Sequence, residues 1–236
     1  MNIPQLSQNS LKFPDIYQAI AERNGFVAFG GDLSVKRLVA AYERGIFPWY
    51  SEGEPICWWA TNPRFVLYPE NLRVSRSLAK KIRNSKYRIT LDFCFADVIR
   101  NCAAPRKNEA GTWITADMQN AYIELHRQNI AHSFECWYEI DGELRLAGGF
   151  YGVLIGGIFC GESMFAKYSD ASKIAFARSV DFLTEKGIKL IDCQMQTEHL
   201  ARFGAEEIDF SVFEQHLAEY KEQKIELSRQ IIFENF

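Results

Sequence analysis

The sequence predicts an α+β protein, and three features of its second half lead to that class. Two strand-like runs at residues 133–140 and 144–153 are joined by Asp141-Gly142, a dipeptide typical of tight hairpin turns. A third strand-like run follows at residues 155–165, and a long helix-like run comes directly after it. Strands that pair in chain order before a helix are typical of a mixed sheet flanked by helices.

Residues 1–63 form a smaller predicted α/β domain, because they carry most of the prolines and turn residues. A helix is expected after Asp32 or Ser34, since either side chain can cap it. Residues 54–64 are aromatic and bounded by prolines, and we interpret them as a connection between domains. We therefore place the domain boundary near Pro63.

The larger domain, residues 64–236, holds further predicted elements besides the hairpin. Ser75 or Ser77 can cap a basic amphipathic helix, and Ser169 or Asp170 can cap the helix after the third strand. The other strand-like runs are residues 64–69, 87–93 and 188–195, and the helix-like runs are residues 75–85, 95–103, 117–129, 170–187, 198–204 and 211–224.

Composition excludes several classes of protein. Hydrophobic residues make up 47% of the 236 residues and charged residues 24%, as in ordinary soluble globular proteins. The six cysteines form no C-x-x-C pair, so we expect reduced thiols in a cytoplasmic protein. Neither a signal peptide nor an apolar run long enough to span a bilayer occurs, so we expect no membrane contact.

The sequence also lacks the usual signatures of metal and cofactor sites. The four histidines have no partner at metal-ligand spacing, so we expect no metal. No nucleophile elbow, phosphate-binding loop or dinucleotide-binding loop occurs, which favours a reaction without a covalent enzyme intermediate or resident cofactor.

Charge is distributed unevenly, although the formal net charge is only -3. The segment from residue 73 to residue 88 contains seven basic residues and no acidic one, whereas the tail beyond Ala205 is rich in acids. A one-sided basic segment favours a polyanionic partner, although a solvated helix face is the alternative. Its basic residues are Arg73, Arg76, Lys80, Lys81, Arg83, Lys86 and Arg88.

One carboxylate, Glu162, lies in the apolar run IFCGESMF at residues 158–165. A lone charge that is buried either costs several kcal/mol or becomes neutral through a shifted pKa. Glu162 can point outward from a strand, can pair with an internal Lys or Arg, or can line a pocket where it meets a cationic ligand.

A polar pair, Asp192 and Gln194, ends the strand-like run at residues 188–195. Because side chains alternate along a strand, we expect Asp192 and Gln194 on one face and Cys193 on the other. The pair is either a structural strand end or part of a site.

The order of three strands, a helix and a further strand is similar to that of GNAT acyltransferases. Their acetyl-CoA-dependent members hold pyrophosphate with a glycine-rich loop before that helix, but AKYSDASK at residues 166–173 contains no glycine. An acyl carrier other than CoA is therefore expected. The basic helix, together with Trp residues in turns bounded by Pro or Gly, favours nucleic acid as that carrier.

Seven motifs in order resemble the leucyl/phenylalanyl-tRNA–protein transferase family, over about residues 4–217. They are GGDLSVKRLVAAYERGIFPWY, WWATNPR, AGTWIT, GGFYGV, IFCGESMF, ASKIA and LIDCQ. The resemblance implies a small N-terminal domain and a GNAT-like catalytic domain. It also implies transfer of Leu or Phe from aminoacyl-tRNA to proteins that begin with Arg or Lys, which marks them for degradation.

The resemblance further implies roles for individual residues. Asp192 and Gln194 are expected at the catalytic centre, with Gln194 at the incoming amine and Asp192 either a general base or an organiser. Glu162 is expected to recognise the cationic N-terminal residue of the acceptor. A monomer without a metal or cofactor, with aminoacyl-tRNA as substrate, is expected.

Three further groups of residues follow from the resemblance. The pocket for the aminoacyl side chain is expected to contain Phe150, Phe159, Met164, Phe176 and Ile191, any of which could instead be core. The terminal adenosine of the tRNA is expected at Trp49 and Trp113, with Tyr42 and Tyr122 nearby. The tRNA phosphates are expected along the basic helix, at Arg76, Lys80, Lys81 and Arg83. The family commonly has Met at the position of Phe150 and an aromatic residue at that of Ser179.

Three rival functions remain open at this point: a CoA-dependent N-acetyltransferase, a Fem-type ligase that takes amino acids from tRNA, and an RNA-binding protein without activity.

Overall fold

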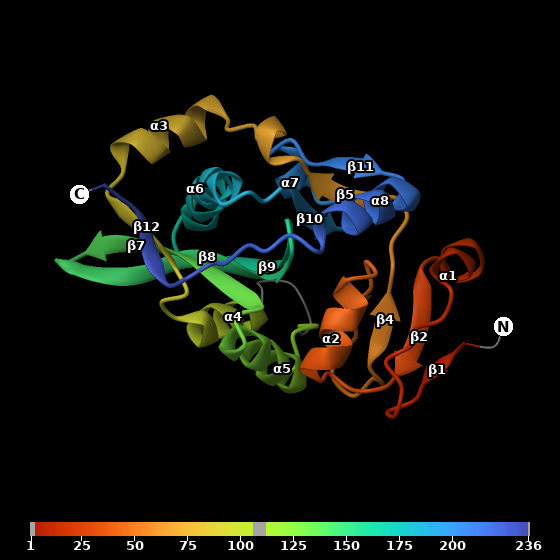
Figure 1. Ribbon diagram of the computed structural model, residues 1–236. Coiled ribbons are helices and arrows are strands. Elements are labelled where there is room, and N and C mark those ends of the chain that lie inside the picture. Colours follow the sequence, from red (N-terminus) through yellow and green to blue (C-terminus); the bar gives the residue numbers. More distant parts are fainter. Residues whose placement is uncertain (1–2, 106–111, 236) are drawn as a thin grey trace.

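The computed structural model describes residues 3–105 and 112–235, and it contains two sheets with helices packed against them (Figure 1). The small sheet has the strand order β1-β2-β4-β3. Its strands and the two helices beside it are β1 (Gln5–Leu6), α1 (Ile16–Arg23), β2 (Phe26–Gly30), α2 (Val35–Tyr42), β3 (Phe47–Pro48) and β4 (Cys57–Trp59).

The large sheet has the strand order β11-β5-β10-β9-β8-β7-β6-β12, and only β9 and β10 run parallel. Its strands are β5 (Arg64–Leu67), β6 (Tyr87–Leu91), β7 (Ala131–Ile140), β8 (Glu143–Ile155), β9 (Ile158–Ala166), β10 (Leu190–Gln194), β11 (Glu206–Ile208) and β12 (Gln230–Asn235). The helices of this part are η1 (Pro69–Asn71), α3 (Arg76–Asn84), α4 (Phe95–Ala103), α5 (Ala116–Arg127), α6 (Ala171–Glu185), α7 (Glu198–Ala201) and α8 (Phe210–Tyr220).

The predicted hairpin is confirmed. Strands β7 and β8 pair antiparallel up to Ile140 and Glu143, and Asp141 and Gly142 between them have φ values of 55° and 78°. Positive φ at both central residues matches the right-handed twist of the paired strands. The structure also decides two helix caps: the hydroxyl of Ser34 begins α2, and that of Ser75 begins α3.

One prediction for the N-terminal part is wrong, because the segment expected to be a connection contains strand β4. Trp58 lies at its centre and pairs with Ala28 of β2 and Pro48 of β3. The indole is fully buried, and its Nε1 donates to the carbonyl of Gly30 at 2.9 Å. Because prolines bound the segment at both ends, the sequence pattern did not indicate this short strand, which tertiary packing stabilises.

Two apolar clusters lie on opposite faces of the large sheet, with α4 and α5 on one side and α6 on the other (Figure 1). The first cluster joins Leu38, Trp58, Leu125 and Tyr151, so it includes residues from both sides of Pro63. The predicted boundary therefore separates the two sheets but not their shared core. Both sheets are mixed, as the predicted class requires at its coarse level, while the GNAT-like arrangement stays a prediction.

None of the helices in the described ranges combines the length and the apolar character needed to cross a membrane.

Candidate active site

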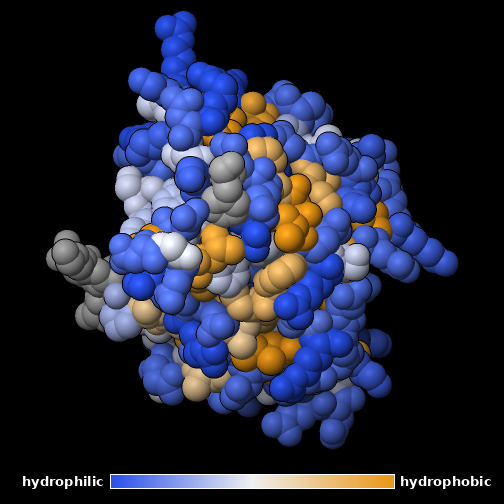
Figure 2. Space-filling view, turned by 90° about the vertical axis from the view of Figure 1, so that its left-hand side faces the viewer, coloured by the Kyte–Doolittle hydropathy of each residue, from blue (hydrophilic) through white to orange (hydrophobic). Residues whose placement is uncertain are grey.

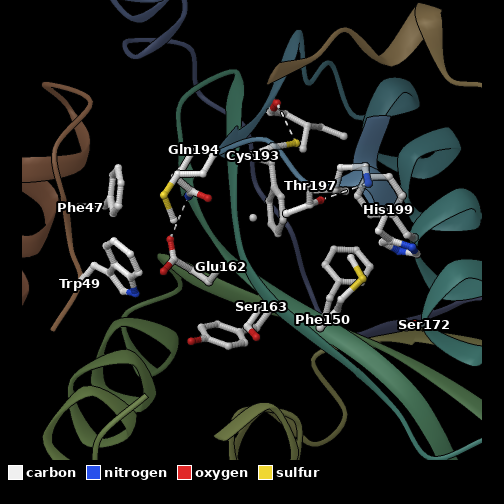
Figure 3. A pocket seen from close by; sticks show the side chains of 18 of the residues that line it. Phe47, Trp49, Phe150, Glu162, Ser163, Ser172, Cys193, Gln194, Thr197 and His199 are labelled. Carbon is white, nitrogen blue, oxygen red and sulfur yellow. Dashed lines mark hydrogen bonds between the residues drawn. The ribbon is translucent and has the colours of Figure 1, made fainter. Parts of the chain in front are cut away.

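A cavity of about 540 Å³ opens between α6 and strands β8, β9 and β10 (Figure 3). The structure brings together there all five residues that were predicted to surround an aminoacyl side chain. Three of their rings form the apolar wall: the ring centroids of Phe150 lie 6.1 Å from Phe159 and 5.7 Å from Phe176. The complete predicted set that lines the cavity is Phe150, Phe159, Met164, Phe176 and Ile191.

Two tryptophans line the same cavity at the side of the small sheet. Trp49 follows strand β3 and is 40% exposed, and Trp113 precedes α5. The indole Nε1 of Trp59 donates to the carbonyl of Trp49 at 2.8 Å, which fixes the backbone there. The first two residues of the AGTWIT motif lie outside the described residues.

Glu162 lines the cavity as well, and its contacts exclude two of the three alternatives for it. Its carboxylate is turned inward from β9 and contacts the hydroxyls of Tyr42 and Tyr122, with oxygen–oxygen distances of 2.7 and 3.1 Å. The side-chain amide of Gln194 donates to Oε1 at 3.3 Å (Figure 3). Among the described residues, no Lys or Arg forms an ion pair with Glu162. Of the three alternatives, the one that fits these contacts is a carboxyl group that lines the cavity.

Burial raises the pKa of Glu162 to about 7. The two tyrosine hydroxyls oppose this change, the negative charge of Asp192 adds to it, and Arg64 opposes it from the same side. Near neutral pH this carboxyl group is therefore poised between its two charge states.

The structure corrects the role predicted for Tyr42 and Tyr122. Their side chains are buried, with 1% and 0% of the residue exposed, so neither ring presents a face to a nucleotide base. The hydroxyls bond to each other and to Glu162 instead. Both phenols point from helices into the first apolar cluster, where the ring of Tyr122 packs edge-on against Tyr151.

The alternation predicted for Asp192 and Gln194 is also wrong. The pairing of β10 with β5 shifts register between these two residues, and Gln194 has a φ of 54°. As a result Ile191, Cys193 and Gln194 line the cavity, whereas Asp192 does not. A local bulge of this kind re-aims one side chain at the end of a strand.

Asp192 instead forms a buried ion pair with Arg64, which begins strand β5. The guanidinium nitrogens donate to both carboxylate oxygens at 2.7 and 2.6 Å, and neither residue is exposed. The backbone N–H of Gln194 donates to Asp192 Oδ1 at 3.0 Å, and Thr61 donates to the Gln194 carbonyl at 2.8 Å. Asp192 therefore holds the backbone that presents the Gln194 amide to Glu162.

Arg64 was not predicted as a site residue. It also donates to the carbonyl of Gly45, and its guanidinium lies 4.5 Å from the ring centroid of Phe213. The sequence carried one signal for it, an arginine at the start of the apolar strand RFVL. An arginine in such a place needs an internal partner.

A second group that was not predicted lines the far end of the cavity, at the start of α6 and α7. Ser172, Lys173, Thr197 and His199 make this end polar (Figure 3). Burial, together with the charges of Lys173 and a neighbouring arginine, lowers the pKa of His199, so its imidazole is favoured in the neutral form. Within the described chain, the Nε2 atom of His199 has no hydrogen-bond partner.

The basic residues predicted to contact phosphates lie on α3, which packs against α6. Arg76, Lys80, Lys81 and Arg83 are all exposed, while Leu78 and Ile82 are buried. Lys81 forms an ion pair with Asp170 at the start of α6. Figure 2 shows the molecule from the left-hand side of Figure 1, where hydrophilic residues surround apolar ones in the middle of the view.

Comparison with known proteins identifies the family that this chain resembles. A family model described as leucyl/phenylalanyl-tRNA protein transferase matches residues 66–218, and the model of that family's N-terminal domain matches residues 31–62. Curated relatives with the name leucyl/phenylalanyl-tRNA–protein transferase include one from Pseudomonas syringae pv. syringae, 54% identical over 85% of this chain and 86% of its own length. Another relative, from Neisseria meningitidis serogroup B, is 52% identical over 87% of this chain and 86% of its own length.

A solved structure, that of L-PGS from Bacillus licheniformis, is 12% identical and covers 69% of this chain and 52% of its own, with a TM-score of 0.41. A likeness of this strength carries no argument about function or detailed fold.

Proposed function

The chain belongs to the leucyl/phenylalanyl-tRNA–protein transferase family, and we propose that it moves Leu or Phe from aminoacyl-tRNA to the α-amino group of proteins that begin with Arg or Lys. The product would carry a degradation signal at its new N-terminus. We further expect a cytoplasmic monomer that needs no cofactor.

The proposed reaction is the aminolysis of an ester. The acceptor amine attacks the aminoacyl carbonyl, the C–N bond forms, and the bond to the ribose oxygen breaks as that oxygen takes a proton. A free α-amine has a pKa of roughly 7.7–8.0, so part of it is neutral at cellular pH without strong base catalysis. Correct positioning of amine and ester alone can contribute roughly 7–11 kcal/mol to such a reaction.

Different parts of the cavity suit different parts of the aminoacyl-tRNA. Its apolar wall, with the rings of Phe150, Phe159 and Phe176 packed edge to face, suits the side chain of Leu or Phe. Trp49 and Trp113, which both line the cavity, would sandwich the terminal adenosine, where stacking contributes about 1–3 kcal/mol per base. The exposed basic face of α3 would then follow the acceptor-stem phosphates.

Glu162 and Gln194 form the proposed acceptor end of the site. A carboxylate that faces the cavity and has no internal cation favours an acceptor with a positive N-terminal residue, while the Gln194 amide lies beside it. Asp192 does not line the cavity and is paired with Arg64, which favours the organising role over that of a general base. Asp192 is thus proposed as a positioning residue.

The single observation that carries the proposal is the convergence of Glu162, Gln194, two tryptophans and the apolar wall on one cavity. The test is transfer of labelled Leu or Phe from charged tRNA to peptides that begin with Arg, Lys or Ala. We expect labelling of the Arg and Lys peptides only. Equal labelling of the Ala peptide, or transfer of acetyl groups from acetyl-CoA in place of the aminoacyl group, would contradict the proposal.

A further inference from the structure

The side chains of Glu162, Tyr42 and Tyr122 form a closed triangle, which three oxygen–oxygen contacts join. Oε1 contacts the hydroxyl of Tyr42 at 2.7 Å, Oε2 contacts the hydroxyl of Tyr122 at 3.1 Å, and the two hydroxyls are hydrogen-bonded to each other. The Gln194 amide adds a donor on Oε1 alone, at 3.3 Å.

A count of hydrogens distinguishes the two charge states of this triangle. If Glu162 is ionised and both phenols donate to it, both available hydrogens are used, and the contact between the phenol oxygens has none. If Glu162 carries a proton, three hydrogens serve three contacts. The proton then belongs on Oε2, because Oε1 already accepts from Gln194 and Tyr42. Oε2 donates to Tyr122, Tyr122 donates to Tyr42, and Tyr42 donates to Oε1.

The surrounding charges agree with a neutral Glu162. The phenols stay protonated, because burial raises the pKa values of Tyr42 and Tyr122 well above their ordinary range. The titratable groups that face Glu162 from the sheet are Tyr151 on β8, Cys160 on β9, Asp192 on β10 and Arg64 on β5. The carboxylate of Asp192 already neutralises Arg64 through two hydrogen bonds, so the guanidinium offers Glu162 no direct partner.

We propose that Glu162 is a neutral carboxylic acid in the free enzyme, closed into a ring of three hydrogen bonds with Tyr42 and Tyr122, and that the cationic acceptor displaces its proton. The acceptor enters with its positive charge, the O–H bond of Glu162 breaks, and the proton leaves to solvent, so that charge is conserved. Tyr42 and Tyr122 are positioning residues in this scheme, since both of their hydrogens become available to the carboxylate that remains.

The displacement step rests on the proposed function, whereas the protonation of the free enzyme does not. A neutral acid avoids the cost of a buried charge until a cation arrives, so that an empty site is stable and a filled site is selective. An acceptor whose N-terminal residue has an uncharged side chain provides no side-chain cation to replace the proton, and the ring of hydrogen bonds stays closed.

Infrared spectroscopy of the free full-length protein tests the protonation state directly. We expect a protonated-carboxyl C=O band at pH 6 that disappears on titration to pH 9. The matched control is Glu135, a second buried glutamate whose pKa is also raised to about 7 by burial but which lies outside the cavity. The Glu135→Gln variant should keep one such band, which we assign to Glu162. The Glu162→Gln variant should lack this band. If Glu135→Gln shows no protonated carboxyl at pH 6, the proposal is wrong, whether or not Glu162→Gln folds.

Calorimetry tests the displacement. Binding of a short peptide with N-terminal Arg, measured at pH 6 in buffers of different ionisation enthalpy, should release about one proton per site from the unmodified protein and from Glu135→Gln. Glu162→Gln should release none. Binding without proton release overturns the displacement step and leaves the proposed transfer intact. A peptide that does not bind at all contradicts the proposed function and the displacement together, while the infrared result still decides the charge state of the free enzyme.

Discussion

Two glutamates on the large sheet, Glu162 on β9 and Glu135 on β7, have a similarly raised pKa but differ in their surroundings. Burial raises the pKa of each to about 7. Glu135 accepts from Ser133 at 2.5 Å, from Thr90, and from two backbone N–H groups that follow β6, and no part of it is exposed. Its donors come from its own strand and from the adjacent β6 and the turn after it.

Glu162 differs in where its donors come from and in what it faces. Tyr42, Tyr122 and Gln194 belong to three elements far apart in the sequence, and the carboxyl group opens into the cavity. A shifted pKa therefore does not identify a functional carboxylate in this protein, because burial is the largest cause of the shift in both glutamates. An accessible space and donors that come from α2, α5 and β10 distinguish the candidate site from the sealed interior.

The largest effect should come from Asp192, a buried carboxylate that unlike the two glutamates has an arginine beside it. Replacement of Asp192 by Ala leaves the Arg64 charge buried without its partner, and we expect a loss of about 3–5 kcal/mol in the free energy of unfolding. Urea denaturation measures this loss. Glu135→Gln, which strands no opposite charge, should cost clearly less, and equal losses would remove the distinction between the paired and unpaired carboxylates.

A smaller effect is expected in the dependence of stability on pH. The native state keeps a proton on Glu135 up to about pH 7, whereas the unfolded chain loses it near the ordinary pKa of 4.5, so the native state binds more protons between these values. Stability should therefore fall as the pH rises through that window. The decrease from this one group is on the order of 3 kcal/mol.

Unfolding free energies at pH 5 and pH 8 check this dependence. The decrease in the free energy of unfolding should be smaller in Glu135→Gln and also in Glu162→Gln. Each variant lacks one of the two glutamates whose pKa is raised to about 7. If the decline between pH 5 and pH 8 is unchanged in Glu135→Gln, that carboxyl group is not held neutral by burial.

The smallest effect is expected from charged residues on the surface. There, a charge reversal on α3 can be compared with a charge reversal elsewhere. Charge reversal at Lys80 and Arg83 of α3 should raise the KM for aminoacyl-tRNA by about 10-fold and reduce its dependence on salt, because phosphate contacts are lost. Lys12→Glu, an exposed change in the N-terminal part, is the control and should leave both quantities as they are. Steady-state kinetics at two salt concentrations decides, and equal effects of the two changes would argue against contact between α3 and RNA.

The sequence predicted those features that depend on local pattern. Alternation and the Asp141-Gly142 turn located the hairpin, and Ser34 and Ser75 capped their helices. The resemblance to the family predicted the five apolar residues that the structure brings to one cavity. Ser179, at a position where the family commonly has an aromatic residue, does not line this cavity.

Features that depend on long-range geometry could not be predicted. The bulge after Asp192 is invisible in a strand pattern, so the same-face rule failed there. The pairing of Asp192 with Arg64 joins residues 128 positions apart. Glu135 in FECW and Glu162 in GESM each have apolar residues nearby in the sequence, and nothing local tells which one meets a cavity. Tyr42 and Tyr122 were expected to be near the site, but only tertiary packing shows that they bond to Glu162 instead of stacking on a base.

The contrast between Glu162 and Glu135 is tested most directly by the preference for an acceptor that begins with Arg over one that begins with Ala, measured as the ratio of kcat/KM values for transfer of Leu. The loss of a charge-assisted hydrogen bond predicts that Glu162→Gln lowers this ratio about 10- to 100-fold, whereas Glu135→Gln retains it. An unchanged ratio in Glu162→Gln, or an equal decrease in both variants, would contradict the assignment of Glu162 as the acceptor carboxylate.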